Sequence, residues 1–301
     1  MIRSISYSKI IMSIAMIAFV AALVVGGTGA FFSDTETSTG NVFAAGDIDL
    51  QIDNESYAID FNIPDFQNPV GALVANPGNS WELADLVAGT HKFFDFTDVK
   101  PGDYGEDTIS IHVGSNDAWM CAATRITDDS DQSCTEPELA DDPTCVTPNG
   151  DGELDNVLQF AFWADDGDNI FEPVQGATGT PETIFFGGDL SELNAGQIAL
   201  AEPAGGAFGT DPVPGGDTVY IGKIWCAGTL TPTNLVQDGL TTGSPLTLGT
   251  GFTCDGTLVD NAAQTDQVVG DIQFYAVQAR NNSQFSCDNY TPDWGEQVTN
   301  Q

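Results

Sequence analysis

Two short acidic segments hold the side chains of this sequence best suited to bind a metal ion. The first reads NGDGELD over residues 149–155, and the second reads DDGDN over 165–169, with a glutamate at 172. Calcium takes about six to eight oxygen ligands, and such loops can wrap around it. Neither segment completes the EF-hand pattern, so the alternative is a pair of acidic turns. We expect Ca²⁺ as the cofactor, held by Asn149, Asp151, Glu153 and Asp155 in the first loop and by Asp165, Asp166, Asp168 and Glu172 in the second.

The two histidines, His91 and His112, are the candidates for a zinc site. A zinc peptidase usually carries HExxH on a helix, which brings two imidazoles to one metal. Neither histidine starts this motif, and the sequence has no GxSxG elbow for a nucleophilic serine. We therefore predict no catalytic residue. A site that the fold assembles from both histidines and a carboxylate stays open as an alternative.

An even number of cysteines, six, follows the N-terminal segment. In an exported chain this is typical of structural disulfides, and no CxxC pair indicates a zinc or redox motif. We expect three disulfides. Cys134 with Cys145, which flank an acidic loop, and Cys226 with Cys254 are the favoured pairs, although the connectivity stays open. The other two cysteines are Cys121 and Cys287.

Residues 1–30 have the layout of a secretory signal. Arg3 and Lys9 flank the start, an apolar run covers 10–25, and small residues lead to Ala30. Because a membrane-spanning helix needs about 20 apolar residues, this run is short for a retained anchor. We predict cleavage between Ala30 and Phe31, secretion to the extracellular space or the cell surface, and membrane contact through the signal alone, before cleavage.

The segment after the predicted cleavage site carries a family resemblance. It reads FFSDTETSTGN and then FAAGDIDLQID, and a VKPGD turn follows at 99–103. With the glycine-rich end of the signal, these motifs resemble the TasA/camelysin family of exported, fibre-forming proteins. The resemblance implies a jelly-roll-like sandwich, a signal peptidase of the SipW type as processing partner, and a place in a biofilm-matrix fibre.

The resemblance also implies how subunits would join. In the family, the mature N-terminal segment inserts into the sheet of the next subunit, so this chain would bind copies of itself head to tail by β-augmentation. Such a contact does not close on itself and therefore builds a filament. The alternatives are a camelysin-type metallopeptidase, a monomeric calcium-binding surface protein, and a segment that is simply the first strand of its own domain. The apolar residues of the assembly strand, 31–50, are Phe31, Phe32, Val42, Phe43 and Ile48.

The composition restricts the partners. The chain has 44 acidic and 7 basic residues, a net charge of -37, and loss of Arg3 and Lys9 with the signal would bring it to about −39. Such a surface repels nucleic acid and anionic lipid. Apolar residues make up 41% and aromatic residues 10% of the chain, which argues against disorder.

Alternating apolar residues predict an antiparallel β-sandwich with long loop insertions. Strands are expected over 107–113, 157–163, 218–225 and 271–280, with shorter ones over 48–52 and 93–96, and a short helix is equally compatible with 181–201. The expected domain covers 51–288, with insertions at 53–90, 127–156 and 229–267 and a C-terminal tail over 289–301.

Overall fold

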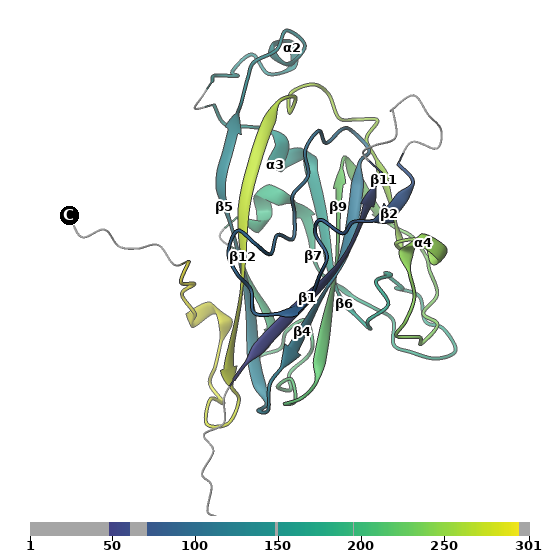
Figure 1. Ribbon diagram of the computed structural model, residues 1–301, viewed down its shortest axis with the longest axis vertical. Coiled ribbons are helices and arrows are strands. Elements are labelled where there is room, and N and C mark those ends of the chain that lie inside the picture. The colour runs from purple at the N-terminus through teal and green to yellow at the C-terminus, as the bar shows by residue number, and fades with distance from the viewer. Residues whose placement is uncertain (1–47, 61–70, 148–149, 195, 295–301) are drawn as a thin grey trace, which may run out of the picture. The chain divides into compact units, whose positions relative to one another are not determined.

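The computed structural model describes residues 48–60, 71–147, 150–194 and 196–294 (Figure 1). All of them belong to the compact unit that runs from Gly46 to Gln301. This unit is built mainly from β-strands, and its helices are one turn long. The elements are β1 (Leu50–Ile59), β2 (Leu73–Ala75), β3 (Trp81–Ala84), β4 (Tyr104–Val113), β5 (Ala118–Asp131), α2 (Glu138–Asp141), α3 (Leu154–Val157), β6 (Leu158–Asp165), β7 (Ile184–Asp189), η1 (Leu190–Leu193), β8 (Gln197–Ala201), β9 (Thr218–Ala227), β10 (Thr229–Pro232), α4 (Pro245–Leu248), β11 (Phe252–Asp255), β12 (Asp266–Gln278) and η2 (Cys287–Asn289).

Two antiparallel sheets carry the fold. The larger has the strand order β2-β1-β4-β9-β6-β7, with β3 also paired to β1, and the smaller has the order β12-β5-β8. In Figure 1, β5 and β12 run side by side apart from β1, β4, β9 and β6. β10 and β11 pair with each other in a separate, two-stranded antiparallel sheet. The predicted mainly-β, antiparallel fold is confirmed, while the jelly-roll connectivity stays a prediction.

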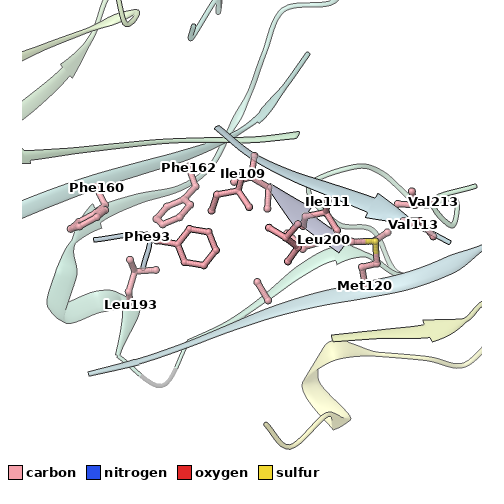
Figure 2. Packing of buried hydrophobic residues seen from close by; sticks show 14 of the residues in the cluster. Phe93, Ile109, Ile111, Val113, Met120, Phe160, Phe162, Leu193, Leu200 and Val213 are labelled. Carbon is pink, nitrogen blue, oxygen red and sulfur yellow. The ribbon is translucent and has the colours of Figure 1, made fainter. Parts of the chain in front are cut away.

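The main core lies between the two sheets. The larger sheet contributes Ile109, Phe162 and Ile221, and the smaller contributes Met120 and Leu200. Figure 2 shows Ile109, Phe162, Met120 and Leu200 pointing into this core, with Phe93 among them. The alternation of apolar residues that predicted the strands is therefore the alternation of core-facing positions.

The other face of the larger sheet is also covered. A smaller apolar cluster joins Ala161 and Trp163 of β6 and Ile224 of β9 to Phe171, which follows β6, and to Phe252 of β11. The Trp163 ring lies over Gly222 on β9, where a Cβ would come within 2.0 Å of its ring carbons. Because loops cover this face, polar side chains that alternate outward on the strands become buried there.

Three disulfides link the strands to the loops. Both favoured pairs are formed, Cys134–Cys145 and Cys226–Cys254, and the remaining pair is Cys121–Cys287. The last bond attaches the segment after β12 to β5 near the start of that strand. Each pair has a Cα–Cα distance between 5.6 and 5.9 Å, within the usual range.

The element predictions hold for β4, β6, β9 and most of β12, but β5, the longest strand, was not predicted and its end lies inside the expected insertion at 127–156. The predictions also differ from the structure in three other places. Residues 93–96 form no strand, although Phe93 is buried in the core. Residues 181–201 hold β7, the single turn η1 and β8 rather than an α-helix. The predicted insertion at 53–90 begins inside the larger sheet, because β1 continues to Ile59 between β4 and the short strands β2 and β3.

Candidate functional site

The second predicted calcium loop starts at the end of β6 and is held by its own hydrogen bonds. Asp165 Oδ2 accepts from the backbone of Gly167 at 3.0 Å and of Asn169 at 3.3 Å, while Asp165 Oδ1 accepts from Trp163 Nε1 at 3.0 Å. Gly167 and Asn169 both have positive φ, which curls the chain tightly. The side chain of Asp168 is thereby turned inward and is 3% exposed.

Residues distant in sequence complete this acidic loop cluster, which we define as Glu106, Asp165, Asp166, Asp168, Glu172, Glu182 and Asp238. One carboxylate oxygen each from Asp168, Glu172 and Asp238 lie within 4.8 Å of one another. Glu182 accepts from the backbone amides of Asp166 at 3.0 Å and Glu172 at 2.8 Å, and so fixes both ends of the loop.

Several oxygens of the acidic loop cluster have no hydrogen-bond partner although they are buried. They include Asp168 Oδ2, Asp166 Oδ1 and both carboxylate oxygens of Glu106, which lies beneath the loop on β4 and is fully buried. The side chain of Asn169 is also buried without a partner. Unpaired buried carboxylates carry a large desolvation penalty, which is relieved when the group binds a cation or takes up a proton.

The electrostatics of the acidic loop cluster are set by burial and by like charges. Burial, followed by the charges of Asp165, Asp166 and Glu172, raises the pKa of Asp168 to about 8. Burial and the charge of Asp165 likewise raise the pKa of Glu182. Burial raises the pKa of Glu106 well above its usual range, with Asp165 as the next cause. A divalent cation would reverse this repulsion.

The first predicted loop is divided by the structure. Glu153 joins Asp131 and Asp266, with one oxygen of each within 4.8 Å of the others. Asp155 instead contacts Asp129. Burial, followed by the charge of Asp155, raises the pKa of Asp129 to about 7. Asp151 is exposed, and Asn149 lies outside the described residues. The first loop therefore does not form the predicted set of four ligands among its described members.

Both acidic groups offer oxygen ligands, which suit hard cations such as Ca²⁺. The third grouping of potential ligands, Asp131 with Cys134 and Cys145, is different because its two sulfurs are bonded to each other. In the part of the chain that the structure describes, no such grouping contains a histidine.

The histidines do not fit a zinc site. His112 uses both ring nitrogens, with Nε2 at 2.9 Å from Asp53 Oδ2 and Nδ1 at 2.9 Å from Thr218 Oγ1. Thr218 on β9 lies directly opposite His112 on β4, and Asp53 on β1 lies diagonally from it, so these hydrogen bonds run across the sheet. His91 accepts from the backbone amide of Val87 at 3.0 Å and stacks on Trp81. No metal-dependent peptidase step can be derived from these residues.

A groove separates the edge strands of the two sheets. It has a volume of about 430 Å³ and is lined by Thr183, Phe185, Phe186, Gln197, Ile198, Ala199, Gly206 and Ala207. Phe185 and Ile198 also line a small space inside the main core, so the groove leads toward the core. We call it the β7–β8 groove.

The predicted assembly strand falls mostly outside the described residues. Phe31, Phe32, Val42 and Phe43 lie there, as does the cleavage site at Ala30. Ile48 and Leu50 are described, and both pack against the main core of their own domain. The end of the predicted segment is therefore part of its own domain, with Leu50 as the first residue of β1 and Ile48 just before it. Within the described residues, no helix is long and apolar enough to cross a membrane.

The fold and the site define a class: a disulfide-linked, mainly antiparallel β protein with oxygen-lined acidic clusters. A family model described as camelysin metallo-endopeptidase matches residues 6–67. This match places the N-terminal segment in the camelysin/TasA family and confirms the resemblance seen in its sequence. No curated protein matches the chain.

Sequence reasoning missed Glu106, Glu182 and Asp238 in the acidic loop cluster, and Asp131 and Asp266 in the other group. Glu182 follows its loop by ten residues, the other four lie farther along the chain from the loops that they join, and none stands in a recognisable motif. One signal was available for Glu106, because an acidic residue inside a strand that is otherwise half apolar is unusual. The other four look like ordinary acidic loop residues or strand ends.

Proposed function

We propose that this protein is a secreted structural subunit of an extracellular filament or matrix fibre. Residues 31–47 of one copy would add a strand to the next copy, and the β7–β8 groove would receive it. The observation that carries the proposal is this groove, which is open, combines apolar side chains with polar groups in its lining, and lies between two sheet edges. Among the described segments, β7 has a strand partner on one side, β6. β8 pairs with β5, and its Ala199 and Leu200 carbonyls also accept from the backbone amides of Ala207 and Phe208.

The groove has the chemistry for a donor strand. The larger side chains that line it, Phe185, Phe186 and Ile198, are apolar and partly buried. An inserted strand would bond to the backbone edge of β7, the last strand of the larger sheet, and alternate side chains would enter the groove. Phe31, Phe32, Val42 and Phe43 supply apolar groups for this, and the family match to residues 6–67 includes them.

The length of the segment also suits the proposal. Seventeen residues precede Ile48 in the mature chain, and an extended chain spans about 3.3–3.6 Å per residue. The segment can therefore reach about 55 Å from the start of its own sandwich. That is far enough to span the six residues of β7 in another copy, about 20 Å.

Deleting residues 31–43 should give a folded monomer that forms no fibres, because the donor strand is gone. The measurement is negative-stain electron microscopy with analytical ultracentrifugation. Ala207→Trp, which fills the groove, should also abolish fibres, while Ala88→Trp at an exposed turn should not. Fibres that still grow from the deleted chain would exclude the donor-strand mechanism.

A synthetic peptide of residues 31–50 tests the acceptor groove independently of the donor segment. It should bind the deleted chain and fail to bind the Ala207→Trp form. If the deletion stops assembly but the peptide binds both forms equally, the donor strand is right and the acceptor groove is wrong.

A second function, calcium binding at the acidic loop cluster, is favoured by its buried, unpartnered oxygens. Millimolar calcium at constant ionic strength should raise the melting temperature of the metal-stripped protein, because the ion binds the ordered loop alone. Asp166→Asn with Asp168→Asn should reduce the increment. The exposed pair Asp211→Asn with Asp217→Asn should leave it unchanged. An increment that the first pair also leaves unchanged would show that the ion does not bind at the acidic loop cluster.

A further inference from the structure

Three carboxylates converge where β5 ends and β12 begins, at the end of the sandwich that carries α2 (Figure 1). Asp131 is the last residue of β5, Asp266 is the first residue of β12, and the two are directly opposite in the antiparallel register. Like charges directly opposite one another destabilise a strand pair. Glu153, which precedes α3, brings a third carboxylate to within 4.8 Å of both. The fold therefore concentrates negative charge where an isolated sheet would avoid it.

The carboxylates are oriented by backbone hydrogen bonds and keep free oxygens. Asp131 Oδ2 accepts from the amide of Val146 at 2.8 Å, and Asp266 Oδ2 accepts from the amide of Glu153 at 2.7 Å. The second oxygens of both, together with Glu153 Oε2, are buried without a partner. Asp131 is 1% exposed, so water does not compensate its free oxygen.

A fourth buried acid lies beside these three. Asp142 is 6% exposed, and its Oδ1 accepts from the amide and hydroxyl of Thr144 while its Oδ2 has no partner. After burial, the charge of Asp142 is the next cause that raises the pKa of Glu153, to about 7, and Asp266 and Asp131 follow. The neighbours that act on Glu153 are thus carboxylates.

The loop is shaped to come close to these acids. A Cβ at Gly150 would lie 1.7 Å from Asp131 Oδ2, so a residue larger than glycine would push the loop away. A Cβ at Gly152 would lie 3.0 Å from Asp129 Oδ1 and 3.3 Å from the carboxyl carbon of Asp266. Residues 150–153 therefore press against a site whose charges repel one another.

We infer that Asp131, Glu153 and Asp266 bind a calcium ion, with Asp142 as a further acidic neighbour. Oxygens that share one Ca²⁺ at about 2.4 Å lie up to about 4.8 Å apart, which is the spacing of these three. The ion would join the ends of β5 and β12 to the loop that carries the Cys134–Cys145 disulfide. This site is separate from the acidic loop cluster and does not depend on filament assembly.

The test is calcium titration of the metal-stripped mature chain by calorimetry, combined with hydrogen exchange. Glu153→Gln should lose one equivalent of bound calcium, and the calcium-dependent protection of residues 142–155 should disappear with it. Glu136→Gln removes the same charge at an exposed position of the same region and should keep both. Asp168→Asn should leave the protection of residues 142–155 unchanged.

Asp266→Asn provides a second variant for the case in which Glu153→Gln does not fold, because it keeps the size of the side chain at the strand end. It should also lose the equivalent and the protection. The inference is overturned if both variants bind as much calcium as the wild-type chain. It is equally overturned if calcium protects no amide between 142 and 155 in the wild-type chain.

Discussion

Lys223 is fully buried in the main sheet and has three kinds of partner. Its Nζ lies 2.6 Å from Asp107 Oδ2, 3.5 Å from the centre of the Phe94 ring and 3.3 Å from the carbonyl oxygen of Phe93. Burial lowers the pKa of Lys223, while Asp107 raises it. The pair joins neighbouring positions on β4 and β9 and also holds the irregular segment that brings Phe93 into the core.

Replacing Lys223 with Met should lower the free energy of unfolding by about 3–5 kcal/mol, because Asp107 is left buried without its partner. Urea unfolding followed by fluorescence measures this. Asp107→Leu in the same chain should restore most of the loss. Lys92→Met, at an exposed pair with Asp95, should change stability by less than about 1 kcal/mol. A loss below about 1 kcal/mol for Lys223→Met would mean that Asp107 is neutral in the fold.

At the scale of elements, the end of β5 and the loops after β5 and β6 each contain carboxyl groups whose pKa is raised by folding. Burial is the largest cause at Asp168, whose pKa rises to about 8, and at Asp129 and Glu153, where it rises to about 7. Such a group binds its proton more tightly in the folded state than in the unfolded state. It therefore stabilises the fold below its unfolded pKa, near 4, and this stabilisation is lost as pH rises through the folded value.

The melting temperature of the metal-stripped protein should accordingly fall as pH rises from about 5 to about 9, by at least about 5 °C. Differential scanning calorimetry in a chelating buffer measures it. Asp168→Asn should flatten the upper part of this dependence, and Asp211→Asn should not. Calcium should reduce the slope, because the cation takes the place of the protons. A melting temperature that rises over this range would show that these carboxylates ionise without penalty.

The sequence predicted the elements where one local pattern determines them. The strands around Ile109, Phe162 and Ile221 alternate cleanly, and the pairs Cys134–Cys145 and Cys226–Cys254 bracket their own loops. Residues 93–96 look like a strand because Phe93 is apolar, yet this phenylalanine is buried from an irregular segment. Residues 181–201 look helical because leucines at 190 and 193 fall at helical spacing, but those leucines delimit a single turn between two strands.

The site was harder to predict, because its geometry depends on contacts distant in sequence. The second loop supplied Asp168 and Glu172, while Glu106 and Asp238 reach it through the pairing of β4 and the course of a later connection. In the first loop, alternating acids suggested one site, but the register of β5 with β12 assigns Glu153 to Asp131 and Asp266. A strand register cannot be read from the loop that follows it.

At the scale of the whole molecule, charge opposes both folding and assembly. The net charge of -37 is carried by a chain with few basic residues. Charges within one folded chain therefore repel one another, and neighbouring copies of the chain repel as well. Screening decreases this repulsion, since the Debye length falls from about 8 Å at 0.15 M salt to about 3 Å at 1 M.

Raising sodium chloride from 0.15 M to 1 M should raise the melting temperature of the calcium-free chain by about 5 °C or more. Differential scanning fluorimetry measures this increment. Replacing the exposed residues Asp211, Asp217 and Asp260 with Asn should decrease it, because fewer charges remain to be screened. An unchanged melting temperature would show that the charges are too widely spaced to destabilise the fold.

The position of β1 has a mechanical consequence for the proposed filament. The segment that would leave for a neighbouring copy continues directly into β1, which is paired with β4 from Leu50–Val113 to Ala58–Gly105 and bordered on its other side by β2 and β3. A pull along this strand loads its hydrogen bonds together, in shear, instead of breaking them one after another. Tension in a fibre would thus be carried on the donor side of each subunit by β1, inside the larger sheet, and on the acceptor side by the edge strands of the β7–β8 groove.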